Sequence, residues 1–133
     1  MQPAQVIPGV DIVHIPSFAA QLAIPGSRFE HVFSPQELRH AQEHPRRAEH
    51  LAGKWAAKEA FLKAWSLSLL GAPPVLAATE VNFADIEVLP DQWQRPHIYL
   101  RGAIGQLCPW DEANVSISHD GAYAIAMVTV VNS

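Results

Sequence analysis

The chain has 133 residues, of which 49% are hydrophobic and 17% are charged. This composition excludes a largely disordered chain. The length fits one domain, residues 1–133, around one core. Its formal net charge of −4 argues against a nucleic-acid-binding protein, which usually carries a basic excess. A single cysteine, Cys108, excludes an internal disulfide, and the longest apolar run is too short and broken to span a bilayer, so we expect a cytoplasmic protein that binds neither nucleic acid nor membrane.

The first half of the chain predicts one strand followed by helices. Ser34 can cap a helix, and Glu37 completes a capping box with it. That helix should end before Pro45, because the residue before a proline avoids the helical region. In chain order we expect a strand at 6–13, helical turns at about 16–24 and 28–33, a helix from 34, and a long helix from about 46 to 69.

The second half of the chain predicts a small antiparallel sheet. We expect short strands at 81–83 and 86–89, a turn at 90–95, a strand at 97–100, a short helix at 102–108, and strands at 115–118 and 122–131. The tight turn Asp120-Gly121 would join the last two strands as a hairpin. Because helices come first and antiparallel strands later, the fold class is α+β, with a long central helix packed on the sheet.

The long helix carries polar residues where a plain amphipathic helix would not place them. Glu59 and Lys63 are four residues apart and share one face, with Trp55 one turn before them. The plain alternative is an ordinary exposed Glu–Lys pair, worth about 0.2–0.5 kcal/mol. Lys54 and Lys58 form a neighbouring row, which is either a solvated face or a phosphate-binding one.

Two further residues are candidates for a site. Asp11 interrupts an apolar strand, where it either caps the following helix, pairs with a lysine, or joins Glu59 as a ligand of a hard cation such as Mg²⁺. His119 follows a predicted strand, a position that is more often structural than catalytic. The contiguous Ser118-His119-Asp120 does not support a hydrolase triad, because triads are assembled from separated positions.

Read together, three segments carry a family resemblance. They are Gly9-Val10-Asp11-Ile12-Val13, then Trp55-Ala56-Ala57-Lys58-Glu59-Ala60-Phe61-Leu62-Lys63-Ala64, then Val115-Ser116-Ile117-Ser118-His119. In this order they resemble the three motifs of holo-acyl carrier protein synthases, the short type of 4′-phosphopantetheinyl transferase, and look most like actinobacterial members. The resemblance extends to residues 33–38 and 85–88, and it implies the 4′-phosphopantetheinyl transferase-like fold.

The resemblance implies a reaction and the residues for it. Family members transfer the phosphopantetheine arm of coenzyme A to a serine of an acyl carrier protein and release adenosine 3′,5′-bisphosphate. By this resemblance Asp11 and Glu59 bind Mg²⁺, and Glu59 also helps to deprotonate the serine, directly or through water on the metal. Lys63 would neutralise the pyrophosphate. The general base stays open between Glu59, a metal-bound hydroxide and a solvent water.

Other residues would hold coenzyme A. Lys54 and His119 would contact the nucleotide phosphate, Lys58 would add a cation to this set, and Arg95-Pro96 would approach the adenine. Lys54 stands where the family often has arginine, and lysine lacks the bidentate fork of that residue. The resemblance also implies a homotrimer with the site at a subunit interface.

Two departures from the family pattern leave the partner open. Asn114 replaces a histidine of many members, and Ser17 replaces an arginine on the helix that docks the acidic carrier protein. A carrier domain of a type I fatty acid synthase therefore fits at least as well as a free carrier. The alternatives are a nucleotide-binding module without catalysis and another Mg²⁺-dependent phosphate enzyme, such as a small pyrophosphohydrolase.

Overall fold

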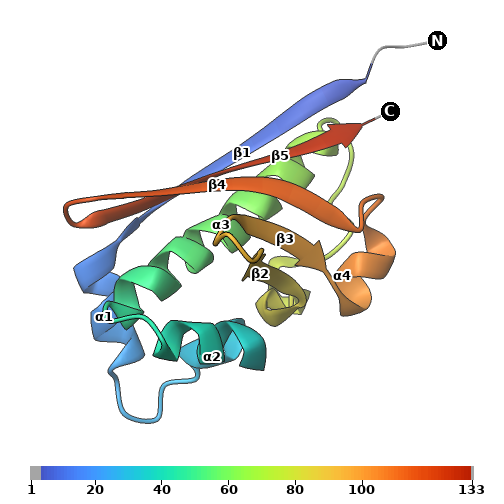
Figure 1. Cartoon of the computed structure of the whole chain (residues 1–133). Coiled ribbons are helices and arrows are strands. Elements are labelled where there is room, and N and C mark those ends of the chain that lie inside the picture. The colour runs from blue at the N-terminus through green and yellow to red at the C-terminus, as the bar shows by residue number, and fades with distance from the viewer. Residues whose placement is uncertain (1–3, 133) are drawn as a thin grey trace.

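A long helix, α3 (Arg47–Ser68), runs along one face of a five-stranded antiparallel sheet (Figure 1). The computed structural model describes residues 4–132. The other helices are α1 (Ile15–Leu22), α2 (Pro35–Gln42) and α4 (Gly102–Leu107), and short 3₁₀ turns lie at Phe29–Val32, Ala78–Glu80 and Phe83–Asp85. The strands are β1 (Gln5–His14), β2 (Ile86–Pro90), β3 (Pro96–Leu100), β4 (Glu112–Asp120) and β5 (Tyr123–Asn132).

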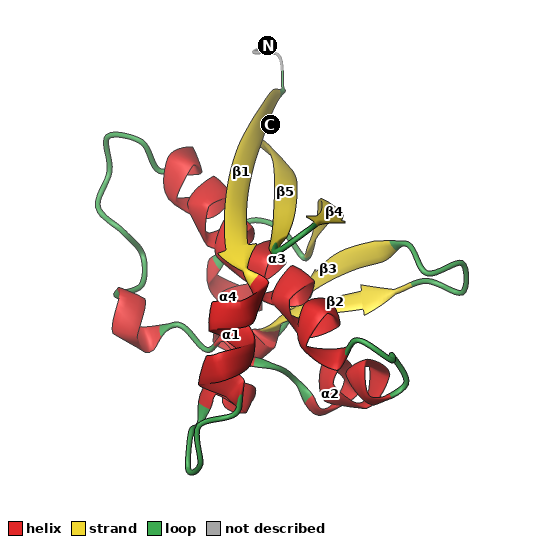
Figure 2. Cartoon of the chain, turned by 90° about the vertical axis from the view of Figure 1, so that its left-hand side faces the viewer, coloured by secondary structure: helices red, strands yellow, loops and turns green. Residues whose placement is uncertain are grey.

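The sheet has the strand order β1-β5-β4-β3-β2 and is strongly twisted, so that β2 and β3 turn away from β1 (Figure 2). The long hairpin β4–β5 forms its centre, and β1 pairs with β5 along its whole length, from Gln5↔Asn132 to His14↔Tyr123. Only two residue pairs, Ile98↔Ala113 and Tyr99↔Glu112, join β3 to β4. The sheet therefore consists of a long ribbon and a short hairpin that share one narrow junction.

The core lies between the sheet and α3. Beside larger side chains such as Phe61, its helical side carries Ala56, Ala57, Ala60 and Ala64, all fully buried. Their small size lets the strands approach the helix backbone closely. Gly9 of β1 is the closest point: a Cβ atom built there would lie 2.0 Å from the carbonyl oxygen of Ala60. Only glycine fits at this crossing.

Most of the predicted elements are confirmed, with one error. The capping box of α2 is present, because Ser34 Oγ accepts from the Glu37 amide while the Glu37 carboxylate accepts from the Ser34 amide. The strand predicted at 81–83 is wrong. Asn82 Oδ1 instead accepts from the Ala84 amide and caps the turn Phe83–Asp85. No helix within residues 4–132 is long and apolar enough to cross a membrane.

Candidate functional site

The crossing of β1 and α3 brings Asp11, Glu59 and Lys63 together. Lys63 Nζ donates to Asp11 Oδ1 at 2.9 Å. The pKa of the Glu59 carboxyl is raised, first by burial and then by the negative charge of Asp11, while Lys63 acts in the opposite direction. The three side chains predicted from two distant motifs thus form one cluster, and the glycine at position 9 allows the approach.

An open pocket of about 340 Å³ lies beside this cluster. Asp11 and Glu59 line it together with the indole of Trp55 and the polar side chains of Ser17 and Gln21. Of the alternatives for Asp11, pairing with a lysine is observed. Helix capping is not, since His14 Nδ1 accepts from the amide of Ser17 at the start of α1.

The donor set of this pocket fits a hard cation. Two carboxylates converge there. Burial first, and then the charge of Asp11, raise the pKa of Glu59, and a divalent cation would offset both effects. Within residues 4–132 no group of three or more His, Cys, Asp or Glu side chains is arranged to hold a metal ion. A Mg²⁺ site with only two protein carboxylates is nevertheless usual, because water and substrate phosphates complete the coordination.

A second cavity, of about 270 Å³, collects other predicted residues. Lys54, Pro96 and His119 line it together with His44 and His50, and we call it the histidine–lysine pocket. Lys54 is only 3% exposed, and its ammonium has no hydrogen-bond partner within residues 4–132. Burial is the main reason that the pKa of Lys54 falls to about 8.

His119 reaches this pocket because of Gly53. A Cβ atom at position 53 would lie 2.9 Å from His119 Nε2, and the same nitrogen lies 3.2 Å from the carbonyl oxygen of Glu49. Arg95, in contrast, is not among the residues that line the pocket. Its guanidinium lies over the ring of Trp93, 5.1 Å from the ring centroid.

Lys58 does not belong with the phosphate-binding residues, contrary to the prediction. Its side chain is fully buried, and its ammonium donates to Glu37 Oε1 at 2.8 Å and to the carbonyl oxygens of Phe83 and Ile86 at 2.8 and 2.6 Å. All three donors of the ammonium are therefore used inside the protein.

The acids around Lys58 were not singled out from the sequence. Glu37 also accepts from the Val88 amide, and Glu87 accepts from Ser34 Oγ and from Arg101 Nε. His44 and His50 of the second pocket were missed as well. Their signal was the spacing of His40, His44 and His50 along two predicted helices that meet at a turn.

Comparison with known proteins agrees with this arrangement. Residues 8–128 match the model of the 4′-phosphopantetheinyl transferase superfamily. A holo-[acyl-carrier-protein] synthase of Corynebacterium glutamicum is 51% identical over 128 residues, which cover 89% of this chain and 92% of the relative. The protein of that name from Mycobacterium tuberculosis is 44% identical over 120 residues, covering 90% and 91% of the two chains.

Solved structures show the same fold. The apo-ACPS structure of Chronobacterium ammoniagenes has a TM-score of 0.90 at 52% identity and covers 97% of this chain and 98% of its own. The ACPS-CoA complex of the same organism has a TM-score of 0.86 at 54% identity and covers 94% and 96% of the two chains. The chain therefore belongs to the 4′-phosphopantetheinyl transferase superfamily, and within it to the holo-acyl carrier protein synthases.

Proposed function

We propose that this protein transfers the 4′-phosphopantetheine group of coenzyme A to a serine of an apo acyl carrier protein, in the cytoplasm and with Mg²⁺. The observation that carries the proposal is the convergence of Asp11 and Glu59 at one open pocket, with Lys63 bonded to Asp11. Relatives that share about half of the sequence are named as holo-[acyl-carrier-protein] synthases, and a neighbouring structure is described as a complex with CoA.

Each residue of the cluster has a chemical role in such a transfer. The serine oxygen attacks the β-phosphorus of coenzyme A, the bond from that phosphorus to the bridging oxygen breaks, and adenosine 3′,5′-bisphosphate leaves. Mg²⁺ held by Asp11 and Glu59 would offset the charge of the pyrophosphate. Lys63 donates to the leaving phosphate, and Glu59 accepts the serine proton directly or through water.

The acceptor that we propose is a carrier domain of a type I fatty acid synthase as much as a free carrier protein. The support comes from α1, the helix that would dock the carrier. It contains no acidic or basic residue, and Ser17 bonds to His14 rather than presenting a charge. An acidic carrier therefore gains no ion pair from this helix, and a covalently tethered domain has less need of one because its local concentration is high.

Mass spectrometry tests this function directly. Purified protein, CoA, Mg²⁺ and an apo carrier should yield a carrier heavier by one phosphopantetheine, and a chelator should stop the reaction. Asp11→Asn and Glu59→Gln should each reduce the rate by about 10²-fold or more, by analogy with other preorganised electrostatic contacts. Glu112→Gln is the matched control, since this exposed carboxylate lines neither pocket.

The same experiment separates the alternatives. Calorimetric binding of CoA without carrier modification would indicate a nucleotide-binding module, and CoA breakdown in the absence of a carrier would indicate a pyrophosphohydrolase. Full activity of both carboxylate variants would refute the metal assignment even if the transfer itself were observed.

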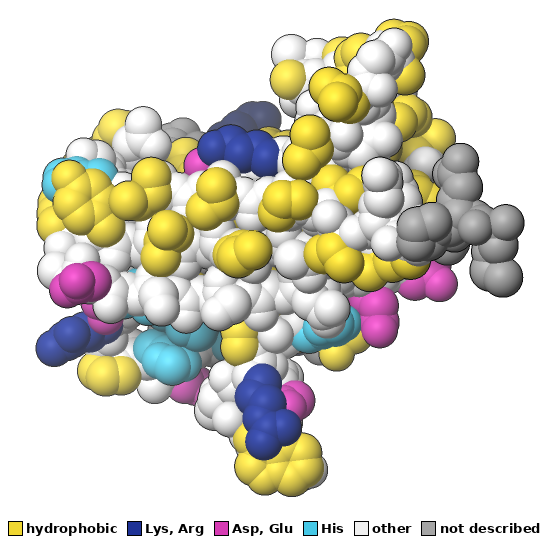
Figure 3. All heavy atoms as spheres, turned by 90° about the horizontal axis from the view of Figure 1, so that it is seen from above, with side chains coloured by type: hydrophobic (Ala, Val, Ile, Leu, Met, Phe, Trp, Pro, Cys, Tyr) yellow, Lys and Arg dark blue, Asp and Glu magenta, His cyan; other side chains and the backbone are white. Residues whose placement is uncertain are grey.

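We also propose that the protein assembles as a homotrimer through the outer face of β1 and β5. Figure 3 shows rows of hydrophobic side chains across this face. Its exposed members form neighbouring cross-strand pairs, Val6↔Val131, Val10↔Met127 and Ile12↔Ile125. A contiguous exposed apolar patch of this kind usually marks an interaction site.

A further inference from the structure

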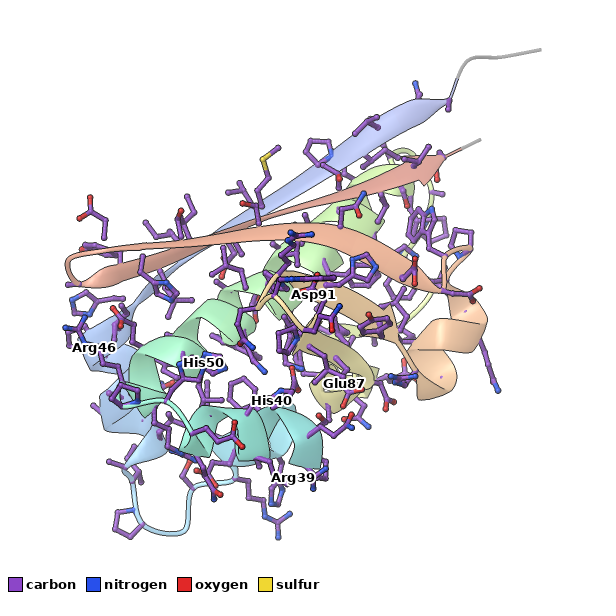
Figure 4. All side chains as sticks on the ribbon, viewed as in Figure 1. Arg39, His40, Arg46, His50, Glu87 and Asp91 are labelled. Carbon is purple, nitrogen blue, oxygen red and sulfur yellow. The ribbon has the colours of Figure 1, made fainter. Side chains whose placement is uncertain are left out.

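The histidine–lysine pocket contains more titratable basic side chains than the proposed reaction uses. The rings of His44 and His50 stack, with centroids 3.9 Å apart and planes 19° apart. His44, His50 and His119 also line an adjoining cavity of about 270 Å³ together with Arg46. Figure 4 shows His40 and His50 on α2 and α3, with Arg46 at the start of α3.

Among the residues that the structure describes, three nitrogen atoms in this region are buried and have no hydrogen-bond partner. They are Lys54 Nζ, His50 Nε2 and His40 Nδ1. Leaving a buried polar atom unpaired costs about 1–3 kcal/mol. Because two of the three belong to residues that line the pocket, the missing partner is best supplied by an acceptor that enters it.

The titratable groups that shift the pKa of His50 come from every neighbouring element, and all of them are basic. They are Lys54 on the same helix, His44 before it, His40 on α2 and His119 on β4. The nearby carboxylate of Glu49 pairs with Arg46 at 3.6 Å. Glu37 and Glu87, the acids that act on Lys54, are engaged by Lys58, Ser34 and Arg101.

These positively charged neighbours oppose protonation of His50 when the pocket is empty. Burial, followed by the charges of Lys54 and the other histidines, lowers the pKa of His50 to about 4. A phosphate monoester in the pocket would reverse the sign of the local potential and raise that pKa. Phosphate oxygens would also be acceptors for the unpaired donors.

We propose that the histidine–lysine pocket binds a phosphate monoester together with a proton, which the stacked His44–His50 pair takes up. The inference rests on the proposed function in that the phosphate belongs to the nucleotide of coenzyme A. Affinity for the nucleotide then rises as the pH falls, by about tenfold per pH unit for each proton taken up. His44 and His50 thus become binding residues, which distinguishes them from the ordinary surface histidines of the chain.

Isothermal titration calorimetry of the full chain with adenosine 3′,5′-bisphosphate tests this proposal without carrier or metal. Titrations near neutral pH in three buffers with different enthalpies of ionisation give the number of protons exchanged. We expect net uptake. A phosphate monoester, with a second pKa of about 6, would release protons in a cationic pocket, and Lys54 is already mostly protonated at this pH, so uptake must come from the histidines.

Two variants and one control locate the proton. His50→Phe keeps a ring beside His44 but removes the titratable nitrogens, and His44→Phe does the same on the other side of the stack. Each should abolish most of the uptake and flatten the pH dependence of Kd. His31→Phe, at an exposed histidine in the 3₁₀ turn Phe29–Val32, should retain both. Histidine Cε1–H NMR titrations of the wild type, with and without the bisphosphate, should show the pKa of His50 rising on binding.

These experiments distinguish a failure of the proton-uptake proposal from a failure of the proposed transferase function. Binding with proton uptake supports the inference even if no carrier is modified. Binding without uptake, with a Kd that does not change with pH, overturns the inference while the transferase function stands. The absence of any bisphosphate binding at millimolar concentration overturns it as well.

Discussion

The ionised form of Glu59 destabilises the folded protein. Burial and the neighbouring Asp11 both oppose its ionisation, and Lys63 offsets them only in part. In the protein without a divalent cation, this carboxylate is therefore a source of instability at neutral pH. Such a cost is common where a site is built for a ligand rather than for its own stability.

Glu59→Gln should for this reason raise the melting temperature of the metal-free protein at neutral pH. The folded-state pKa of Glu59 lies above its unfolded value, so the wild type loses stability as the pH rises through this window, whereas the variant does not. Below the unfolded value both side chains are neutral and the difference should vanish. Differential scanning fluorimetry across this pH range measures it. A variant that melts lower than the wild type at neutral pH would refute the argument.

Lys58 and Lys63 are five residues apart on one helix, yet substitution should affect them in opposite ways. Lys58→Met leaves the Glu37 carboxylate buried without its partner, which costs about 3–5 kcal/mol. Lys63→Met removes a partly exposed pair with Asp11, so stability should change little while transfer activity falls. Urea denaturation and a single-turnover assay of both variants make the comparison. The double variant Lys58→Met/Glu37→Gln should recover part of the lost stability.

These two lysines also show how far the sequence could predict the site. Helical spacing placed Glu59 and Lys63 on one face, and motif order joined them to Asp11. Spacing alone could not tell that Lys58 is buried against α2, because that depends on where Glu37 lies in the fold. The presence of His44 and His50 beside the predicted Lys54, Pro96 and His119 could not be foreseen for the same reason, since the lining of the histidine–lysine pocket comes from segments far apart in the chain.

At the scale of elements, the contact between β1 and α3 positions the carboxylate pair. The neighbours of Gly9 across this contact are backbone atoms: a Cβ atom at position 9 would lie 2.0 Å from Ala60 O and 2.7 Å from Ala64 N. Backbone atoms cannot move aside as a flexible side chain can. Any larger residue must therefore push the strand away from the helix.

Gly9→Ala should accordingly lower stability by about 1–3 kcal/mol or more, and it should reduce transfer activity beyond what the loss of folded protein explains. The activity loss follows because a displaced β1 carries Asp11 away from Glu59. Chemical denaturation and activity per folded molecule measure the two effects. Ser116→Ala, at an exposed position of β4, is the control and should change neither. A fully active Gly9→Ala variant would contradict the role given to this contact.

The ends of helices and strands could be predicted from the sequence where a local interaction determines them. The capping box fixed the start of α2, and the hairpin between β4 and β5 formed as expected, with its turn one residue later, at Gly121-Ala122, because Asp120 still pairs with Tyr123. The strand expected at 81–83 failed because Asn82 bonds to the backbone two residues on. The narrow junction of β3 with β4 was not predictable either, since pairing between strands far apart in sequence depends on the whole fold.

For the molecule as a whole, the outer face of β1 and β5 should control assembly. Ile12→Lys together with Met127→Lys places two charges on the apolar face, and we expect these to convert the proposed trimer into a monomer. Light scattering coupled to size-exclusion chromatography gives the mass of each species. Leu70→Lys, which changes an apolar residue that is 86% exposed but lies outside this face, should leave the trimer intact. A monomeric wild type would disprove the assembly.

Strand β1 lies at the edge of the sheet, and β5, the last strand of the chain, is its sole neighbour there. When the first hundred residues have been translated, the segment that bears Asp11 therefore exists, but strand β5, with which it pairs, does not. The carboxylates can meet only once β5 has been made, because β1 pairs with a strand that lies more than a hundred residues later in the chain. Loss of even a few residues of β5 should release β1 and disable a site to which those residues contribute no side chain.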